Sequence, residues 1–345
     1  MAEPRVDLRS DTFTVPDPPM RRAMAEAEVG DDVWGEDPTV RRLEEAIAER
    51  LGKRAAVYVP SGTMANLCAV AAQTRPGDEV ITDAEGHLVV YEVAGGAVIA
   101  GVQLRAVDAP GGVPTAAAVE AAVRPPNIHH PRSRLLALEN THNRRGGLAV
   151  AADAVAAAAG AAHRHGVRVH CDGARLFNAS VALDCPPRTL VEHCDTVSVC
   201  FSKGLGAPVG SALAGDVDTI DEARRWRKRL GGGMRQAGVI AAAALHALEH
   251  NVDRLGEDHA NARLLVDLLA DAPGARVLRP QVPTNIVMLE TVAPASLVSE
   301  RAAARGVLTA VMDHYLLRCM TYLGIDAGAV RHAGGVLREL LRDAG

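Results

Sequence analysis

The chain has 345 residues, 48% hydrophobic and 23% charged, which is long enough for a large core and two globular domains. Its net charge of −5, with both signs interspersed, argues against nucleic acid or an anionic membrane as a partner held by charge. Residues 1–12 are polar, and the most alanine-rich stretch, 150–162, is too short to span a bilayer. The six cysteines form no C-x-x-C pair, which favours reduced thiols in a cytoplasmic protein over disulfides or a zinc site.

Hydrophobic periodicity predicts strands and helices that alternate along most of the chain. Such alternation implies an α/β fold whose mainly parallel sheet is covered by helices on both faces. The predicted helices cover residues 20–27, 38–51, 62–73, 115–123, 151–165, 217–230, 236–269 with breaks, 294–304 and 326–342. The predicted strands cover residues 55–59, 79–82, 98–104, 135–138, 167–171, 196–201, 211–214, 276–278, 285–290 and 315–320.

The pattern changes near residue 275, where short strands begin to alternate with helices. We therefore expect a large domain over residues 1–250, including an N-terminal arm, and a small α+β domain over residues 251–345, with the boundary near 250–275. Among the helices, the one over 38–51 has the clearest limits, because Pro38 suits a first helical turn and Gly52 a helix stop.

Polar side chains follow three of the predicted strands. They are Glu139 to His142, Asp172 to Arg175, and Ser202 with Lys203. In a parallel sheet, ligands bind beyond the carboxyl ends of the strands. Each group alone could be a helix cap or a salt bridge, but three in succession indicate a site.

Lys203 ends an apolar, β-branched strand, and Gly204 and Gly206 permit a tight turn directly after it. The chain has only three lysines, Lys53, Lys203 and Lys228, among 37 Lys and Arg residues. Burial can lower the pKa of a lysine so that it attacks a carbonyl, whereas arginine stays charged. Lys203 is therefore our candidate Schiff-base lysine. The alternative is a strand-end lysine that reaches solvent.

A strand also leads into a helix that begins Ser61-Gly62-Thr63. The free backbone N–H groups of such a helix start can hold a phosphate, although an ordinary serine N-cap has the same sequence. The chain contains neither a G-x-G-x-x-G fingerprint nor a Walker loop, so a dinucleotide or nucleoside triphosphate site is poorly supported.

Together these groups suggest pyridoxal 5'-phosphate as cofactor. Lys203 would hold its aldehyde, and the carboxylate of Asp172 would pair with the pyridinium nitrogen. The flat side chain of His87 would stack on the ring, while Gly62 and Thr63 would hold the phosphate.

Eight motifs, in order along the chain, carry a family resemblance. They are Asp7–Thr12, Gly30–Thr39, Pro60–Asn66, His87–Glu92, Leu138–Asn143, His170–Arg175, Phe201–Gly206 and Gly231–Gln236. In these motifs the sequence resembles the low-specificity L-threonine aldolases, in the β-eliminating-lyase branch of the fold type I (aspartate aminotransferase-like) enzymes that use pyridoxal phosphate. The last hundred residues resemble the family only at Thr284-Asn285 and Leu317-Arg318.

The resemblance implies further roles for single residues. Besides the roles given above, it implies that His87 handles the hydroxyl proton and that His129, beside His130, is a second active-site histidine. Ser202 belongs to the cofactor site. Lys228 and Arg235 complete the phosphate site from a neighbouring subunit, and Ser10, Arg175 and Arg318 hold the substrate carboxylate. Two departures are Cys171, where relatives often have an apolar residue, and Tyr322, where relatives commonly have histidine.

The resemblance further implies the activity. We expect an aldolase that cleaves L-threonine, L-allo-threonine and related β-hydroxy-α-amino acids to glycine and an aldehyde. It also implies a homotetramer, a dimer of dimers with active sites at subunit interfaces, and no metal is expected.

Three other readings remain open. Within the same cofactor class the chain could be a β-eliminating lyase, a transaldolase or an arylserine aldolase. A metallohydrolase could use His142, His163, His165 and His170, although their spacing matches no zinc signature. A non-catalytic regulator with an enzyme-like fold is disfavoured by the joint presence of Lys203, Asp172 and Arg175.

Overall fold

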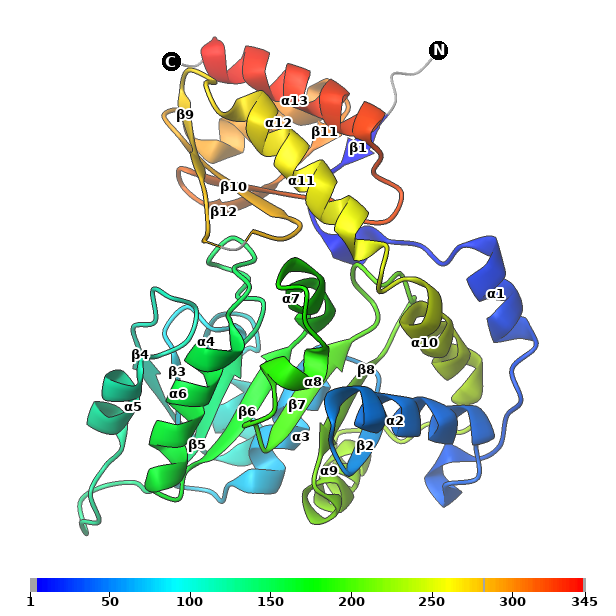
Figure 1. Cartoon of the computed structure of the whole chain (residues 1–345), viewed down its shortest axis with the longest axis vertical. Helices are drawn as coiled ribbons and strands as arrows, with labels where there is room; N and C mark the ends of the chain where they lie inside the picture. Colours follow the sequence, from blue (N-terminus) through cyan, green and yellow to red (C-terminus); the bar gives the residue numbers. More distant parts are fainter. Residues whose placement is uncertain (1–4, 282, 344–345) are drawn as a thin grey trace.

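A computed structural model describes residues 5–281 and 283–343. The predicted domains also include residues 1–4, 282 and 344–345, which lie outside the described residues. The larger part of the chain is built on a seven-stranded sheet in the order β2-β8-β7-β6-β5-β3-β4 (Figure 1). Its strands are β2 (Ala55–Val59), β3 (Glu79–Asp83), β4 (Gln103–Val107), β5 (Ser133–Glu139), β6 (Arg168–Gly173), β7 (Thr196–Cys200) and β8 (Ser211–Gly215).

Five neighbouring strands of this sheet, from β7 to β4, run parallel, and only β8 is antiparallel to both its neighbours. The prediction of a mainly parallel α/β sheet is therefore confirmed. Because the parallel strands end at one edge, the polar residues that follow β3, β5, β6 and β7 come together there.

Helices cover both faces of the sheet (Figure 1). On one face α3 (Gly62–Gln73) packs on β7 and β8 and against α9 (Val217–Arg229). On the other face lie α2 (Pro38–Leu51), α5 (Ala116–Ala122), α6 (Ala152–Arg164), α7 (Leu176–Ala182), α8 (Pro187–Leu190) and α10 (Gly238–His250). Helix α1 (Pro18–Ala25) packs on α10. The core between the layers is made of aliphatic residues and alanine, including Ile47, Leu136, Val169 and Val197, all fully buried.

The C-terminal part has a sheet and a core of its own. Its sheet follows the order β12-β13-β10-β9, with β9 (Ala275–Leu278), β10 (Ile286–Thr291), β12 (Ala310–Asp313) and β13 (Leu316–Met320). Helices α11 (Leu255–Leu269), α12 (Ala295–Ala304) and α13 (Ala327–Arg342) cover it. Leu265, Leu289 and Leu337 lie in this core. Strand β1 (Val6–Asp7) pairs with β11 (Val307–Leu308), so the N-terminal arm joins the C-terminal part.

One predicted element was wrong in its limits. Residues 98–104 do not form one strand, because Gly96–Ala100 is a π-helical turn and β4 begins only at Gln103. The apolar run that suggested a strand is largely exposed there, with Val98 76% accessible. The helical region over 236–269 has its predicted break between α10 and α11. Short elements such as α4 (His87–Val90), α7, β1 and β11 were not foreseen.

All six cysteines are free, and five of them are buried. Within residues 5–281 and 283–343, no helix combines the length and the apolar character that crossing a membrane requires.

Candidate active site

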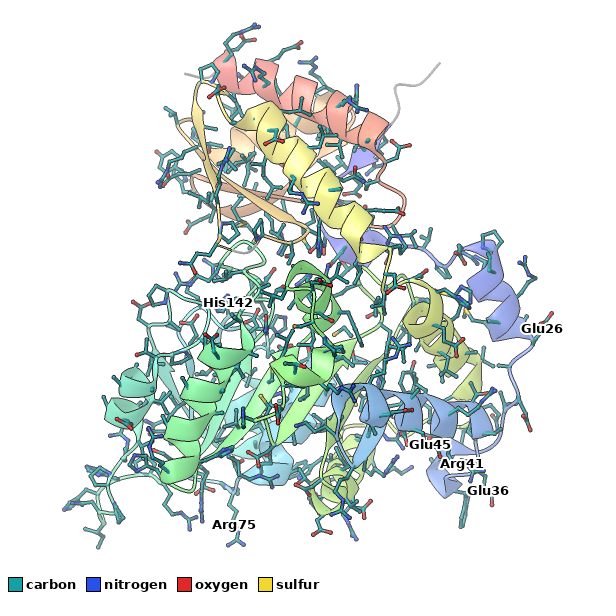
Figure 2. The ribbon with its side chains drawn as sticks, in the orientation of Figure 1. Glu26, Glu36, Arg41, Glu45, Arg75 and His142 are labelled. Atoms are coloured by element: carbon teal, nitrogen blue, oxygen red, sulfur yellow. The ribbon has the colours of Figure 1, made fainter. Side chains whose placement is uncertain are left out.

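The candidate site lies at the carboxyl edge of the large sheet, below the C-terminal part. Figure 2 labels His142 near this edge, shortly after β5 ends, and Arg75 near the opposite edge, shortly before β3 begins. Asp172 lies in the last residues of β6, Lys203 follows β7, and His87 begins the short helix after β3. Three segments far apart in sequence thus bring an amine, a carboxylate and an imidazole to one place.

Lys203 sits in a tight turn after β7. Its carbonyl accepts hydrogen bonds from the Gly206 N–H at 2.8 Å and from Thr14 Oγ1 at 3.0 Å, and Gly206 has a left-handed φ of 84°. The side chains of Lys203 and the preceding Ser202 are half-buried. The charge of Lys203 is one of the causes that lower the pKa values of Asp172 and Asp11.

Asp172 is buried and hydrogen-bonded through both carboxylate oxygens. Oδ1 accepts from the Ala174 N–H at 3.0 Å, and Oδ2 accepts from Asn66 Nδ2 at 2.7 Å. Burial by itself raises the pKa of Asp172, but the charges of His87 and Lys203 and the Asn66 hydrogen bond outweigh it and hold that pKa below its ordinary value. The carboxylate is therefore ionised at neutral pH.

His87 is fixed by two buried carboxylates. Its backbone N–H donates to Glu139 Oε2 at 2.8 Å, and its Nδ1 lies 2.9 Å from Glu92 Oε1. Burial lowers the pKa of His87, but the Glu92 hydrogen bond and the charge of Asp172 raise it above its ordinary value. Burial also raises the pKa of Glu92. The imidazole and the two carboxylates of Glu92 and Asp172 have ligand atoms within 4.8 Å of one another, a spacing that a metal could use, but Asn66 already donates to both carboxylates.

The start of α3 has the features of an anion site. Ser61 is the N-cap, and its Oγ accepts the Met64 N–H at 3.2 Å. In the described part of the chain, the N–H groups of Gly62 and Thr63 have no acceptor. A Cβ at Gly62 would lie 2.8 Å from Cys200 Sγ, so only glycine fits at this close approach. The predicted phosphate ligands thus lie on one exposed helix start, as a phosphate requires.

The two predicted carboxylate-binding arginines have different partners. Arg175 is buried and donates from Nε and Nη2 to the carboxylate of Asp11 at 2.7 and 2.8 Å. Arg318 donates from Nη1 to Asn143 Oδ1 at 3.0 Å and from Nη2 to the Arg9 carbonyl at 3.2 Å. Its buried Nε has no partner, and no carboxylate of a described residue pairs with it. Burial and the charge of Arg175 lower the pKa of Arg318, so an anion would be favoured beside it.

The remaining predicted site residues are Ser10, on the N-terminal arm, and three residues that lie elsewhere in the single chain. Ser10 caps the 3-10 turn Asp11–Phe13, its Oγ accepting the Thr12 N–H at 3.3 Å. His129 is exposed four residues before β5, at the amino edge of the sheet and therefore apart from His87. Lys228 and Arg235 are exposed as well.

Lys228 lines a cleft of about 530 Å³ together with Val33, Trp34 and arginines of α9. Arg235 Nη1 lies 3.8 Å from Asp31 Oδ2. These two cations face solvent, so their predicted role depends on a neighbouring subunit.

The histidines of the metallohydrolase reading do not converge. His142 Nε2 lies 2.7 Å from Asp83, His163 Nε2 lies 3.0 Å from Asp195, and His170 is bonded within the core. In the described residues, these histidines share no set of three ligands that could hold a metal ion.

Three residues that hold the site together, Asp11, Asn66 and Glu92, were not singled out from the sequence, and Glu139 was named only within a polar group after a strand. Each lies inside or beside a motif that was noticed for another residue. Asn66 and Glu139 lie in mostly buried stretches, where a polar side chain indicates an obligatory partner without identifying it, whereas Asp11 and Glu92 have exposed neighbours and gave no such signal.

Comparisons with known proteins identify the family and the fold of the chain. The family model described as beta-eliminating lyase matches residues 7–292. A low-specificity L-threonine aldolase of Arabidopsis thaliana is 48% identical over 289 residues, which is 83% of this chain and 81% of the relative. The low specificity L-threonine aldolase of Escherichia coli K12 is 41% identical over 323 residues, which is 93% of this chain and 95% of the relative.

Solved structures show the same fold at low identity. A threonine aldolase of Leishmania major has a TM-score of 0.82 and 20% identity, over 97% of this chain and 99% of that one. A serine palmitoyltransferase of Sphingomonas wittichii has a TM-score of 0.79 and 19% identity, over 99% and 88%. These structures establish the fold type I architecture.

Proposed function

This chain belongs to the beta-eliminating lyase family, and from its low-specificity L-threonine aldolase relatives we propose that it is a pyridoxal phosphate-dependent aldolase. It cleaves L-threonine, L-allo-threonine and related β-hydroxy-α-amino acids to glycine and an aldehyde. The observation that carries this proposal is that Lys203, Asp172 and His87 stand at or just after the carboxyl ends of β7, β6 and β3, where the charges of Lys203 and His87 lower the pKa of Asp172.

The residues present fit the cofactor. The free N–H groups at Gly62 and Thr63 suit its phosphate, the ionised Asp172 suits a protonated ring nitrogen, and Lys203 is an amine beside both acidic groups of the site. When bound, pyridoxal phosphate supplies an aldehyde that condenses with amines and a ring that takes up the electrons of the broken carbon–carbon bond.

Residues of the N-terminal arm and of β13 orient the substrate. Arg318 offers its unpaired Nε to the substrate carboxylate, and Ser10 adds a hydroxyl. Arg175 joins them with Nη1, because Asp11 occupies only its Nε and Nη2. Fixing the carboxylate fixes how the amino acid is turned in the site, which is a large part of the rate enhancement in such a reaction.

Proton transfer falls to His87. In the neutral ring whose Nδ1–H donates to Glu92, Nε2 is unprotonated and can accept the proton of the substrate β-hydroxyl. His129 is the second predicted base, and its position requires that it act in the site of another subunit. Lys203 would hold the cofactor through its amine.

An assembly of several chains is part of the proposal. Lys228 and Arg235 reach the phosphate of a neighbouring subunit across the cleft beside Trp34, whose side chain is 78% exposed. A second exposed apolar segment contains Val93 and Val98, at 92% and 76% exposure. Two separate contact surfaces suit a homotetramer built as a dimer of dimers. The free cysteines suit the cytoplasm as its location.

Product analysis tests the reaction. The holoenzyme is given L-threonine or L-allo-threonine, and glycine, acetaldehyde, 2-oxo acid and ammonia are measured. Equal amounts of glycine and acetaldehyde support the proposal. Ammonia and 2-oxo acid as main products would instead show elimination, which is the second candidate because the matching family model is named for it.

A further inference from the structure

A row of buried polar side chains crosses the face of the sheet beneath α3. His170 and Asp172 lie two residues apart on β6, and their register partners on β7 are Thr196 and Ser198. All four are at most 3% exposed. Residues two apart on a strand point to the same face, so these four side chains form a square on one side of the sheet. Such a polar group in an apolar core is costly unless every member has a partner.

Asn66, on α3, supplies the central partner. Its Nδ2 donates to Asp172 Oδ2 and to Glu92 Oε1, both at 2.7 Å. Its Oδ1 accepts from Ser198 Oγ at 2.9 Å and lies 3.1 Å from His170 Nε2. Asn66 is 1% exposed, and both protons and both lone pairs of its amide are used. One side chain therefore joins the two carboxylates that hold the predicted ring nitrogen and the predicted base.

The surrounding hydrogen bonds fix which way this amide faces. An amide oxygen only accepts, so His170 Nε2 must carry a proton. Burial lowers the pKa of His170 to about 4, so the ring is neutral and its Nδ1 accepts from Thr196 Oγ1 at 2.9 Å. Thr196 Oγ1 in turn accepts from Gln73 Nε2 at 2.9 Å. The hydrogen bonds of the row therefore all run toward Asp172 and Glu92. If the amide of Asn66 were turned by 180°, its oxygen would face the two carboxylates, which cannot donate to it when ionised.

We propose that Asn66, oriented by His170 and Ser198, is a positioning residue that keeps Asp172 ionised for the ring nitrogen of the cofactor. The physical reason is repulsion between carboxylates. Oxygens of Glu92 and Asp172 lie within 4.8 Å of each other. Without the amide, Asp172 loses one of the two hydrogen bonds that favour its charged form and faces the Glu92 carboxylate directly, so it stabilises a positive ring nitrogen less well. This inference rests on the proposed function, because it assumes that cofactor.

The test compares two ligands of the apoprotein. Dissociation constants are measured for pyridoxal phosphate and for its analogue with carbon in place of the ring nitrogen. We expect Asn66→Leu, which keeps the volume and removes the hydrogen bonds, to weaken pyridoxal phosphate by about tenfold or more, and the analogue by less than about twofold. A loss of similar size for both ligands would mean that Asn66 only maintains the fold, and would overturn the proposal.

Two further variants complete the design. Ser198→Ala leaves Asn66 Oδ1 with His170 alone, so a smaller loss, again selective for pyridoxal phosphate, is expected even if Asn66→Leu does not fold. An unselective loss in Ser198→Ala would count against the proposal. Asn261→Leu is the matched control. Asn261 lies on α11, away from the row, and its Nδ2 donates to the Ile325 carbonyl. A wild-type protein that binds neither ligand would refute the proposed cofactor itself, which is a separate outcome.

Discussion

The chain's three lysines have different surroundings, and this difference singles out Lys203. Lys53 Nζ donates to three backbone carbonyls, those of Val191 at 2.9 Å, Glu192 at 3.4 Å and Cys194 at 2.6 Å, so its three protons are committed to backbone oxygens. Lys228 is exposed on α9. Lys203 alone lies beside buried carboxylates at the sheet edge.

We expect Lys203→Ala to lose turnover by at least about 1,000-fold, because the group that anchors the cofactor is removed. Borohydride reduction followed by peptide mapping should place the cofactor adduct on Lys203 in the wild type and find none in the variant. Lys53→Met is the control, and it should keep the adduct at Lys203 while losing stability. Turnover at the wild-type rate in Lys203→Ala with added cofactor would contradict the assignment.

The pH profile should report His87. The Glu92 hydrogen bond and Asp172 raise the pKa of His87, and a base works only when unprotonated, so activity should fall as pH drops through this raised value. Glu92→Gln removes one of the raising charges. We expect the acid limb of kcat/KM against pH to move to lower pH by roughly half a unit to one unit. An unmoved acid limb would assign it to another group.

Replacing Arg318 should weaken substrate binding with little effect on thermal stability. Its buried Nε lacks a partner, so removing the charge relieves a desolvation cost while it removes the carboxylate anchor. We expect Arg318→Gln to raise KM for L-threonine by about 10- to 100-fold with little or no loss of Tm. Steady-state kinetics and thermal unfolding measure both quantities. A large drop in Tm with unchanged KM would assign Arg318 a structural role.

At the scale of elements, the sequence predicted those limits of helices and strands that neighbouring residues determine. Pro38 begins α2, and Gly52 ends it with a left-handed φ of 63°, as the sequence indicated. The strand ends that carry Asp172 and Lys203 were also predicted from local sequence, as apolar runs followed by polar residues. Asn66 and Asp11 were missed because their partners lie 106 and 164 residues away, and no local pattern encodes such distances. The exposed π-helical turn at 96–100 has the composition of a strand, so composition misled there.

The first turn of α3 offers a test of the phosphate site. Gly62→Ala would place a methyl group 2.8 Å from Cys200 Sγ, so the helix start must shift. We expect the affinity for pyridoxal phosphate to fall about tenfold, because the N–H groups move with the backbone. The double variant Gly62→Ala with Cys200→Ala removes the clash and should recover most of the affinity. Equal weakness in single and double variants would show that the methyl group itself, or another contact, is responsible.

At the scale of the molecule, the N-terminal arm connects the two sheets through the site. Strand β1 pairs with β11, and the Leu8 carbonyl accepts the Met320 N–H at 2.8 Å. A few residues later Asp11 binds Arg175, and Thr14 holds the Lys203 carbonyl. The arm thus contacts both hydrophobic cores and the catalytic edge. The domain boundary near 250–275 stays a prediction, and the arm makes the two parts interdependent whichever boundary is drawn.

If active sites are shared between subunits, mixing two inactive variants should restore part of the activity. If Arg235 completes the phosphate site of a neighbour, Lys203→Ala and Arg235→Ala damage the same site from different subunits. A hybrid pair then contains one site with both defects and one with neither. Random mixing makes half the pairs hybrid, so about a quarter of all sites should recover wild-type activity.

The mixture is prepared by unfolding and refolding equal amounts of the two variants, and exchange is verified by pull-down through a tag on one of them. Each variant refolded alone is the control, and the mixed sample should exceed the sum of both. A verified hybrid with no gain in activity would mean that Arg235 serves its own chain or none. In the single chain the Arg235 side chain is 62% exposed and 3.8 Å from Asp31 Oδ2, so we expect its solvent-facing guanidinium to reach the phosphate site of another copy.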